Sequence, residues 1–178
     1  MDNNSNALVK DCIVKALIEL MNKKNFDEIS ITEICNKAGV SRMSYYRNYY
    51  TKKDILQFYL DDISKEFKTE THNLINFNIY TNKNVIKYLF TYFKKYSFFA
   101  KTLLKANLSG MLQETLNKYL EEETKIASRS AYQKYHMYSY AGALYNVYIK
   151  WIENDMKESI DEISAYFCEA NKYIWEAN

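Results

Sequence analysis

The sequence has no proline and only three glycines among its 178 residues. Proline and glycine are the residues that most often interrupt helices, so their scarcity predicts an all-α chain. The sequence also lacks any apolar run of about 18 residues, and no segment is therefore predicted to span a membrane. The N-terminal segment MDNNSNALVK has no basic start followed by an apolar run, so we expect no signal peptide.

Cysteine and histidine are also rare, and their positions do not suggest a metal site or a disulfide framework. Cys12, Cys35 and Cys168 are odd in number and far apart, which favours free, buried thiols in a reducing cytoplasm. His72 and His136 lack the spacing of metal ligands. We also find no Gly-rich phosphate loop and no nucleophile motif. The sequence therefore predicts neither an enzyme nor a protein that holds a metal or a cofactor.

The net charge is only +2, but it is unevenly distributed along the chain. Residues 1–53 carry nine basic and six acidic side chains, whereas the remaining residues carry one net negative charge. Within that first part, the segment from Lys37 to Lys53 has five basic residues and no acidic one. A basic excess confined to one end of the chain is typical of a DNA-binding head.

The spacing of apolar residues predicts a series of amphipathic helices with a break somewhere in residues 69–82. We expect a head of residues 1–50 and a helical body of residues 51–178, joined by the fourth helix. The predicted helices cover residues 6–23, 30–38, 42–48, 51–68, 84–96, 97–105, 108–127, 131–154 and 159–176.

Residues 30–53 have the pattern of a helix-turn-helix. Ser30 is followed three residues later by Glu33, which predicts a capping box at the start of a short helix. Gly39 then suits a left-handed cap at the end of that helix, and Ser41 begins a second short helix. A compact, basic helix-turn-helix with hydroxyls on its second helix is suited to a phosphate-lined groove, so DNA is the predicted partner.

The segment ITEICNKAGVSRMSYYRNYYTKKDIL resembles the signature of the tetracycline-repressor-like (TetR/AcrR) transcriptional regulators. Residues 38–41 match its Ala-Gly-Val-Ser, and Tyr45–Tyr49 fill its aromatic pattern, with Asn48 where the family has histidine. Lys52 stands where the family has a lysine at the start of its fourth helix. The resemblance implies a three-helix DNA-binding head on a helical bundle that dimerises and binds a ligand.

The exposed start and outer face of the helix over residues 42–48 are the predicted DNA contact. Arg42 has the geometry to read guanine with a two-pronged contact. The resemblance implies that Tyr46 touches the DNA backbone while Tyr45 and Tyr49 pack inward. The alternative is a solvated helix face, and capping alone explains Ser30 equally well. The predicted DNA-binding residues are Ser30, Thr32, Ser41, Arg42, Met43, Ser44, Tyr46, Arg47 and Lys52.

Wide aromatic stripes on the last two helices predict a surface at which two copies associate. One stripe must pack inside the monomer, and the resemblance implies that these two helices form a four-helix interface. The alternative is that both stripes belong to the core of a single chain. The predicted interface residues are Tyr140, Leu144, Tyr148, Trp151, Tyr166, Phe167, Ala170, Tyr173 and Ile174.

Aromatic residues also cluster in the middle helices and around His136, which suggests a pocket for a small apolar or aromatic effector. The predicted lining residues are Phe90, Phe93, Tyr96, Tyr135 and His136. The alternative is a solid aromatic core, enriched in tyrosine by an AT-rich genome.

Taken together, these features predict a sequence-specific DNA-binding transcriptional regulator that recognises an inverted-repeat operator. The interpretation we favour is a homodimeric, cytoplasmic repressor that a small-molecule effector releases from DNA. The alternative is an interaction protein, such as a co-activator, that has the same fold but does not bind DNA.

Overall fold

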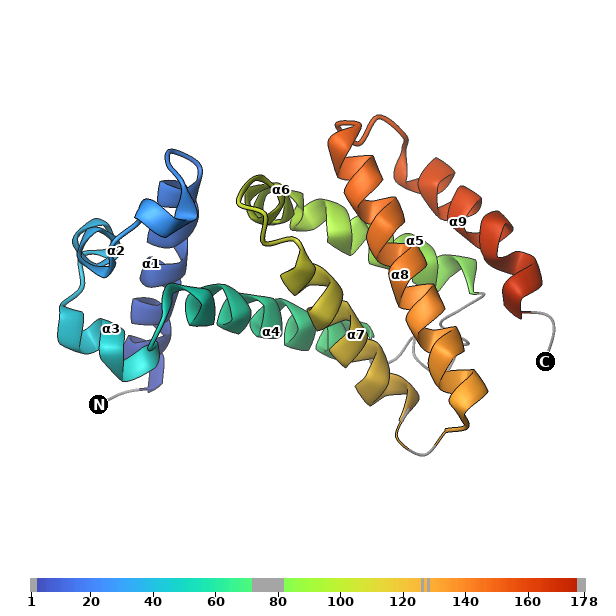
Figure 1. Ribbon diagram of the computed structural model, residues 1–178, viewed down its shortest axis with the longest axis horizontal. Coiled ribbons are helices and arrows are strands. Elements are labelled where there is room, and N and C mark those ends of the chain that lie inside the picture. The colour runs from blue at the N-terminus through green and yellow to red at the C-terminus, as the bar shows by residue number, and fades with distance from the viewer. Residues whose placement is uncertain (1–2, 72–81, 126, 128, 176–178) are drawn as a thin grey trace. The chain divides into compact units, whose positions relative to one another are not determined.

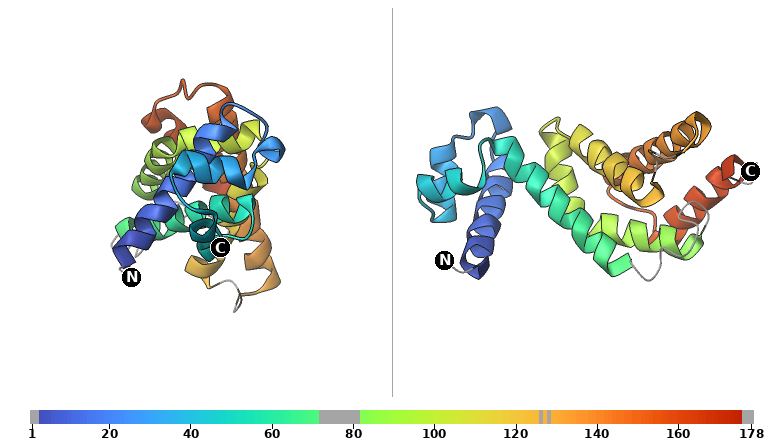
Figure 2. Two further views of the ribbon diagram at one scale, coloured as in Figure 1. Left: turned by 90° about the vertical axis from the view of Figure 1, so that its left-hand side faces the viewer. Right: turned by 90° about the horizontal axis from the view of Figure 1, so that it is seen from below.

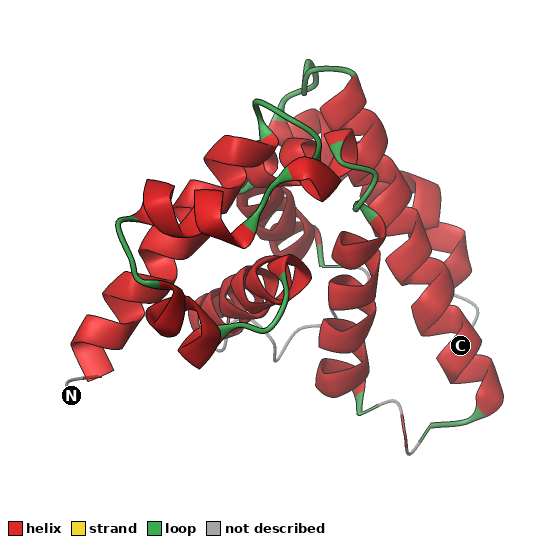
Figure 3. Ribbon diagram, turned by 60° about the vertical axis from the view of Figure 1, so that its left-hand side comes forward, coloured by secondary structure: helices red, strands yellow, loops and turns green. Residues whose placement is uncertain are grey.

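The computed structural model describes residues 3–71, 82–125, 127 and 129–175, and the side chains of residues 6–71, 82–125, 127 and 129–171. Every regular element in this part of the chain is a helix, and the described residues form no strand (Figure 3). The predicted all-α class is therefore confirmed. Most of the predicted break within residues 69–82 lies outside the described residues, as does His72.

The helix bounds lie within a few residues of those predicted from apolar periodicity (Figure 1). A short 3-10 helix, η1 (Phe26–Glu28), separates the first two α-helices. The α-helices are α1 (Asn3–Met21), α2 (Ile31–Ala38), α3 (Arg42–Asn48), α4 (Lys52–Thr71), α5 (Lys83–Lys95), α6 (Ser97–Lys105), α7 (Gly110–Thr124), α8 (Ala131–Glu153) and α9 (Ile160–Trp175).

Several helices end in the left-handed backbone conformation although the chain has few glycines. Gly39 ends α2 with a φ of 67°. After α6, α7 and α8 the same region is occupied by non-glycine residues, namely Asn107, Lys125, Asp155 and Met156. A left-handed residue lets the last carbonyl groups of a helix find hydrogen-bond donors, and asparagine and aspartate tolerate it better than most residues. These turns therefore end helices in a chain that lacks the usual breakers.

The chain divides into two compact units. The first comprises residues 1–63 and 102–109, and is larger than the predicted head of residues 1–50. In it, α1, α2 and α3 pack on one another around a core that also takes residues from the start of α4. Its fully buried side chains include Ile13, Leu17, Ile34, Tyr45, Ile55 and Leu56.

The second unit comprises residues 64–101 and 110–178, and an aromatic cluster fills its core. Helix α5 packs against α9, and α7 packs against α8 (Figure 2). The ring of Phe90 lies 5.8 Å from both the Trp151 and Phe167 rings, and Phe167 lies 5.6 Å from Tyr140. The polar end of Trp151 is satisfied, because its indole Nε1 donates to the Glu158 carbonyl at 3.1 Å.

Candidate nucleic-acid interface

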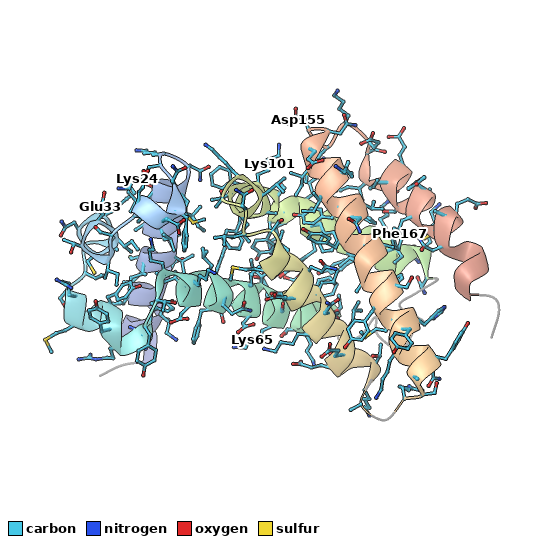
Figure 4. All side chains as sticks on the ribbon, in the orientation of Figure 1. Lys24, Glu33, Lys65, Lys101, Asp155 and Phe167 are labelled. Carbon is cyan, nitrogen blue, oxygen red and sulfur yellow. The ribbon has the colours of Figure 1, made fainter. Side chains whose placement is uncertain are left out.

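The start of α2 is fixed by the predicted capping box, which the structure confirms. The Glu33 backbone N–H donates to Ser30 Oγ at 3.2 Å, and the Ser30 N–H donates to Glu33 Oε2 at 2.9 Å. Lys24 pairs with the other Glu33 oxygen at 2.6 Å (Figure 4). The Lys24 ammonium, together with Ser30, lowers the pKa of Glu33 to about 2. The carboxylate therefore stays charged at the helix start, where it complements the helix dipole.

This arrangement affects the two DNA contacts predicted at α2. Ser30 Oγ accepts from the Glu33 N–H and donates to the Glu33 carboxylate at 2.8 Å, so its hydroxyl is used within the protein. Thr32, in the first turn of the same helix, is exposed. The DNA contacts of both residues remain predictions, and Thr32 is the more available of the two.

The turn between α2 and α3 is short because Gly39 takes the left-handed conformation that the sequence predicts. Its N–H donates to the Asn36 carbonyl at 3.3 Å, and the Val40 N–H donates to the Cys35 carbonyl at 3.0 Å. Ser41 then caps α3, where its Oγ accepts from the Ser44 N–H at 3.1 Å. These bonds set the direction in which α3 leaves the turn.

One side of α3 is anchored in the core of the first unit. Tyr45 is 0% and Tyr49 is 2% exposed, which is the inward packing that the resemblance implied. The two rings contact each other with centroids 6.1 Å apart. The Tyr45 hydroxyl has no hydrogen-bond partner among the described residues, and burial raises the pKa of Tyr45 to about 12. The orientation of α3 is thus set by two buried rings one turn apart.

The rest of the α3 surface is exposed and carries no acidic residue. Arg42, Met43, Tyr46 and Arg47 are all exposed, and Met43 reaches 76%. The Arg42 guanidinium lies 6.0 Å from the centre of the Tyr46 ring, within range of a cation–π contact. The structure therefore brings four predicted DNA-binding residues onto one surface, which we call the α3 face.

Two exposed residues beside α3, Tyr50 and Lys53, are not among the predicted site residues. Tyr50 directly follows the α3 C-cap and is 85% exposed, and Lys53 is exposed in the first turn of α4. No helical spacing points to Tyr50, because α3 ends at Asn48 and the backbone of its C-cap, Tyr49, is extended. Both residues lie close in sequence to the α3 face.

Lys52 is turned toward the protein's own backbone. Its ammonium donates to the carbonyl oxygens of Phe26 at 2.6 Å and Asp27 at 3.2 Å, and lies 4.6 Å from the centre of the Phe26 ring. Burial lowers its pKa. In this position the ammonium ties the start of α4 to η1, so a phosphate contact would require it to exchange or share these acceptors. That contact remains a prediction.

Replacing Lys52 by methionine is expected to destabilise the first unit by about 1–3 kcal/mol, because two carbonyl oxygens lose a charged donor. Lys53→Met is the matched control, since Lys53 is the exposed neighbour and should change stability by less than about 0.5 kcal/mol. Urea unfolding of the two variants measures the difference. Equal stability of the two variants would show that the bonds of Lys52 to η1 do not matter for the fold.

The structure places the five residues predicted to line an effector pocket in different surroundings, although the rings of Phe90 and Phe93 contact each other with centroids 5.8 Å apart. Phe90 is 0% exposed in the core of the second unit, and Phe93 stacks on Tyr148 with centroids 4.3 Å apart. Tyr135 is 75% exposed, and His136 stacks on the Tyr132 ring. The remaining predicted residue, Tyr96, donates its hydroxyl to Glu66 Oε2 at 2.6 Å. Phe90 is thus a core residue, while Tyr135 lies at the surface.

Five of the predicted interface residues are buried within the chain itself: Tyr140, Leu144, Tyr148, Trp151 and Phe167. The rings of Tyr148, Trp151 and Phe167 contact Phe90 or Phe93 on α5, so these buried side chains offer a partner little surface. Tyr166 is 61% exposed and Ala170 is exposed. The side chains of Tyr173 and Ile174 lie outside the described residues. Apolar periodicity located the stripes but did not separate the core side from the surface side.

The exposed side of α8 and α9 has a surface groove of about 450 Å³. Tyr166 stands at this groove, and small residues such as Ala165 and Ala170 are exposed on the same helix. The lining residues are Asn146, Val147, Lys150, Trp151, Asn154, Glu158, Ile163 and Tyr166. We call this surface the α8–α9 groove. It combines an exposed aromatic side chain, Tyr166, with a concave surface.

The described part of the chain has neither a membrane-spanning helix nor a cluster of metal ligands. None of its helices has the length and apolar character needed to cross a membrane. Among the same residues, no group of three or more His, Cys, Asp or Glu side chains is placed to hold a metal ion.

A family model described as a transcriptional regulator C-terminal region matches residues 81–172, which is just over half of the chain. The protein is therefore a transcriptional regulator. The chain belongs to the TetR family, which confirms the resemblance seen in residues 31–56. The match lies in the second half of the chain, so two separate segments indicate the same family. A comparison with curated proteins found no match.

Proposed function

We propose that this protein is a homodimeric, sequence-specific DNA-binding transcriptional regulator that inserts α3 into the major groove. The observation that carries the proposal is the α3 face, an exposed and acid-free surface held in place by a capped helix-turn-helix. In helix-turn-helix proteins the second helix enters the groove, and its first residues reach the base edges. Residues 1–50 would act as the DNA-binding domain and residues 51–178 as the regulatory domain.

Each polar residue among the predicted DNA-binding residues has a role suited to its chemistry. Arg42 reads guanine through its two-pronged guanidinium, and Arg47 and Tyr46 contact the backbone. The hydroxyls and the lysine serve as phosphate donors that set the register of the protein on the duplex. Thr32, Ser41 and Ser44 belong to this group, and Ser30 and Lys52 join it by exchanging their bonds to Glu33 and to η1 for bonds to phosphate.

Salt dependence provides the test of DNA binding, because phosphate contacts release counterions. The logarithm of the association constant should fall linearly with the logarithm of the salt concentration, as a titration of the purified protein with a labelled duplex would measure. Absence of duplex affinity at low salt would favour the alternative, an interaction protein of the same fold that does not bind DNA.

The proposed dimer uses the α8–α9 groove rather than the buried stripes. Tyr166→Arg should raise the dissociation constant of the dimer by about 100-fold or more, because a twofold interface brings both new charges into one contact. Phe98→Arg is the matched control, since Phe98 on α6 is 64% exposed and Tyr166 is 61% exposed. Sedimentation should find Tyr166→Arg monomeric and Phe98→Arg dimeric at micromolar concentration. A monomeric wild-type protein would contradict the proposal.

We further propose that the regulator is a repressor and that a small apolar or aromatic effector releases it. The operator would favour dimers with one spacing of the two heads, and the effector would favour dimers with another. Binding of the effector would therefore weaken binding of the operator. The family assignment supports this regulatory scheme. Measuring duplex affinity with and without candidate effectors tests it.

A further inference from the structure

One of the well-exposed side chains on α3 is apolar. Met43 is 76% exposed, at the second position of the helix between Arg42 and Ser44. Tyr45 and Tyr49 are buried on the other side, and a helix rotates by about 100° per residue, so Met43 projects almost directly away from the core. Arg47 follows it by four residues on the same outward side. The part of the α3 face farthest from the core therefore carries the thioether of Met43 and the guanidinium of Arg47.

The major groove offers few apolar groups to such a side chain. Base edges there present hydrogen-bond donors and acceptors, and the C5-methyl of thymine is the apolar feature. The charged phosphates of the DNA backbone do not complement a thioether. We infer that Met43 reads thymine by packing against its 5-methyl group. This inference rests on the proposed DNA binding and names the base that one side chain recognises.

The position and chemistry of Met43 both favour this role. It lies in the first turn of α3, and the first residues of a recognition helix are those that reach base edges. The helix start is held by the Ser41–Ser44 bond of 3.1 Å, which fixes the backbone that carries Met43. The side chain itself is unbranched and polarizable, so it can fit against a methyl group at several depths.

Replacing thymine by deoxyuridine removes the 5-methyl group and leaves the hydrogen-bonding edge unchanged. We would take the duplex most enriched from genomic fragments and replace each thymine in turn. One thymine in each half-site should then lose about three- to tenfold in affinity for the wild-type protein, which is the effect of one buried methyl group. Met43→Ala should bind the thymine duplex with a similar loss and show no further loss on uracil at that position.

Leu8→Ala is the control, because Leu8 is an apolar residue on α1 that is 65% exposed and lies outside the α3 face. It should keep both the affinity and the uracil effect of the wild-type protein. If every uracil effect is the same in Met43→Ala as in the wild type, the inference is wrong although DNA binding stands. If the wild-type protein binds no duplex, the proposed function fails and the inference fails with it.

Discussion

Arg42→Ala is expected to lower the affinity for the preferred operator by about 10- to 100-fold per half-site, while affinity for unrelated duplexes falls much less. A two-pronged contact to guanine contributes about 1–3 kcal/mol of discrimination against the wrong base. Arg42 is exposed at the first position of α3, and no acidic residue lies between Lys37 and Lys53 to neutralise it. Competition binding with specific and unrelated duplexes measures both losses.

Arg42→Lys separates charge from geometry, because lysine keeps the positive charge but lacks the planar fork. It should retain most of the affinity for unrelated duplexes and lose sequence preference almost as far as alanine does. If Arg42→Lys discriminates between duplexes as well as the wild-type protein does, Arg42 acts as a phosphate contact and not as a base reader.

Phe167→Ala is expected to destabilise the second unit by about 3–5 kcal/mol, which is typical of truncating a buried ring. Phe167, labelled in Figure 4, is 0% exposed. Its ring contacts those of Phe90 on α5 and Tyr140 on α8. The truncation would leave a cavity where α5, α8 and α9 meet. Thermal or urea unfolding monitored by circular dichroism measures the loss.

Phe167→Leu is the matched control, because leucine fills much of the same volume and should lose roughly half as much stability or less. It should also remain a dimer if Phe167 is a core residue. A Phe167→Ala protein that is as stable as the wild type but monomeric would contradict the burial seen here. That result would place Phe167 in an interface between chains, as the aromatic stripe alone first suggested.

The parts of the site that sequence predicted well depend on residues close together in the chain. The capping box joins Ser30 to Glu33, and Gly39 closes its turn with bonds that span three to five residues. The inward packing of Tyr45 and Tyr49 follows from a four-residue spacing on a helix. Local geometry alone decides such features.

The features that sequence could not supply depend on distant residues. Lys52 bonds to the carbonyl of Phe26, 26 residues away, and nothing near Lys52 in the sequence signals that its ammonium turns inward. Helix α8 is apolar on more than one side, so periodicity could not tell that Tyr140 and Trp151 face the core. The tertiary structure is needed to show which apolar stripe packs inside the chain and which is exposed to a partner.

The most direct test of the proposed function is selection of genomic DNA fragments by the purified protein at low salt. We expect enrichment of an inverted repeat whose half-sites lie on one face of the duplex, about 34–36 Å apart or a multiple of that distance. The Arg42→Ala protein, tested in parallel, should enrich these fragments weakly or not at all. Wild-type protein that enriches no sequence over input DNA would contradict the assignment of α3 as a reader of DNA.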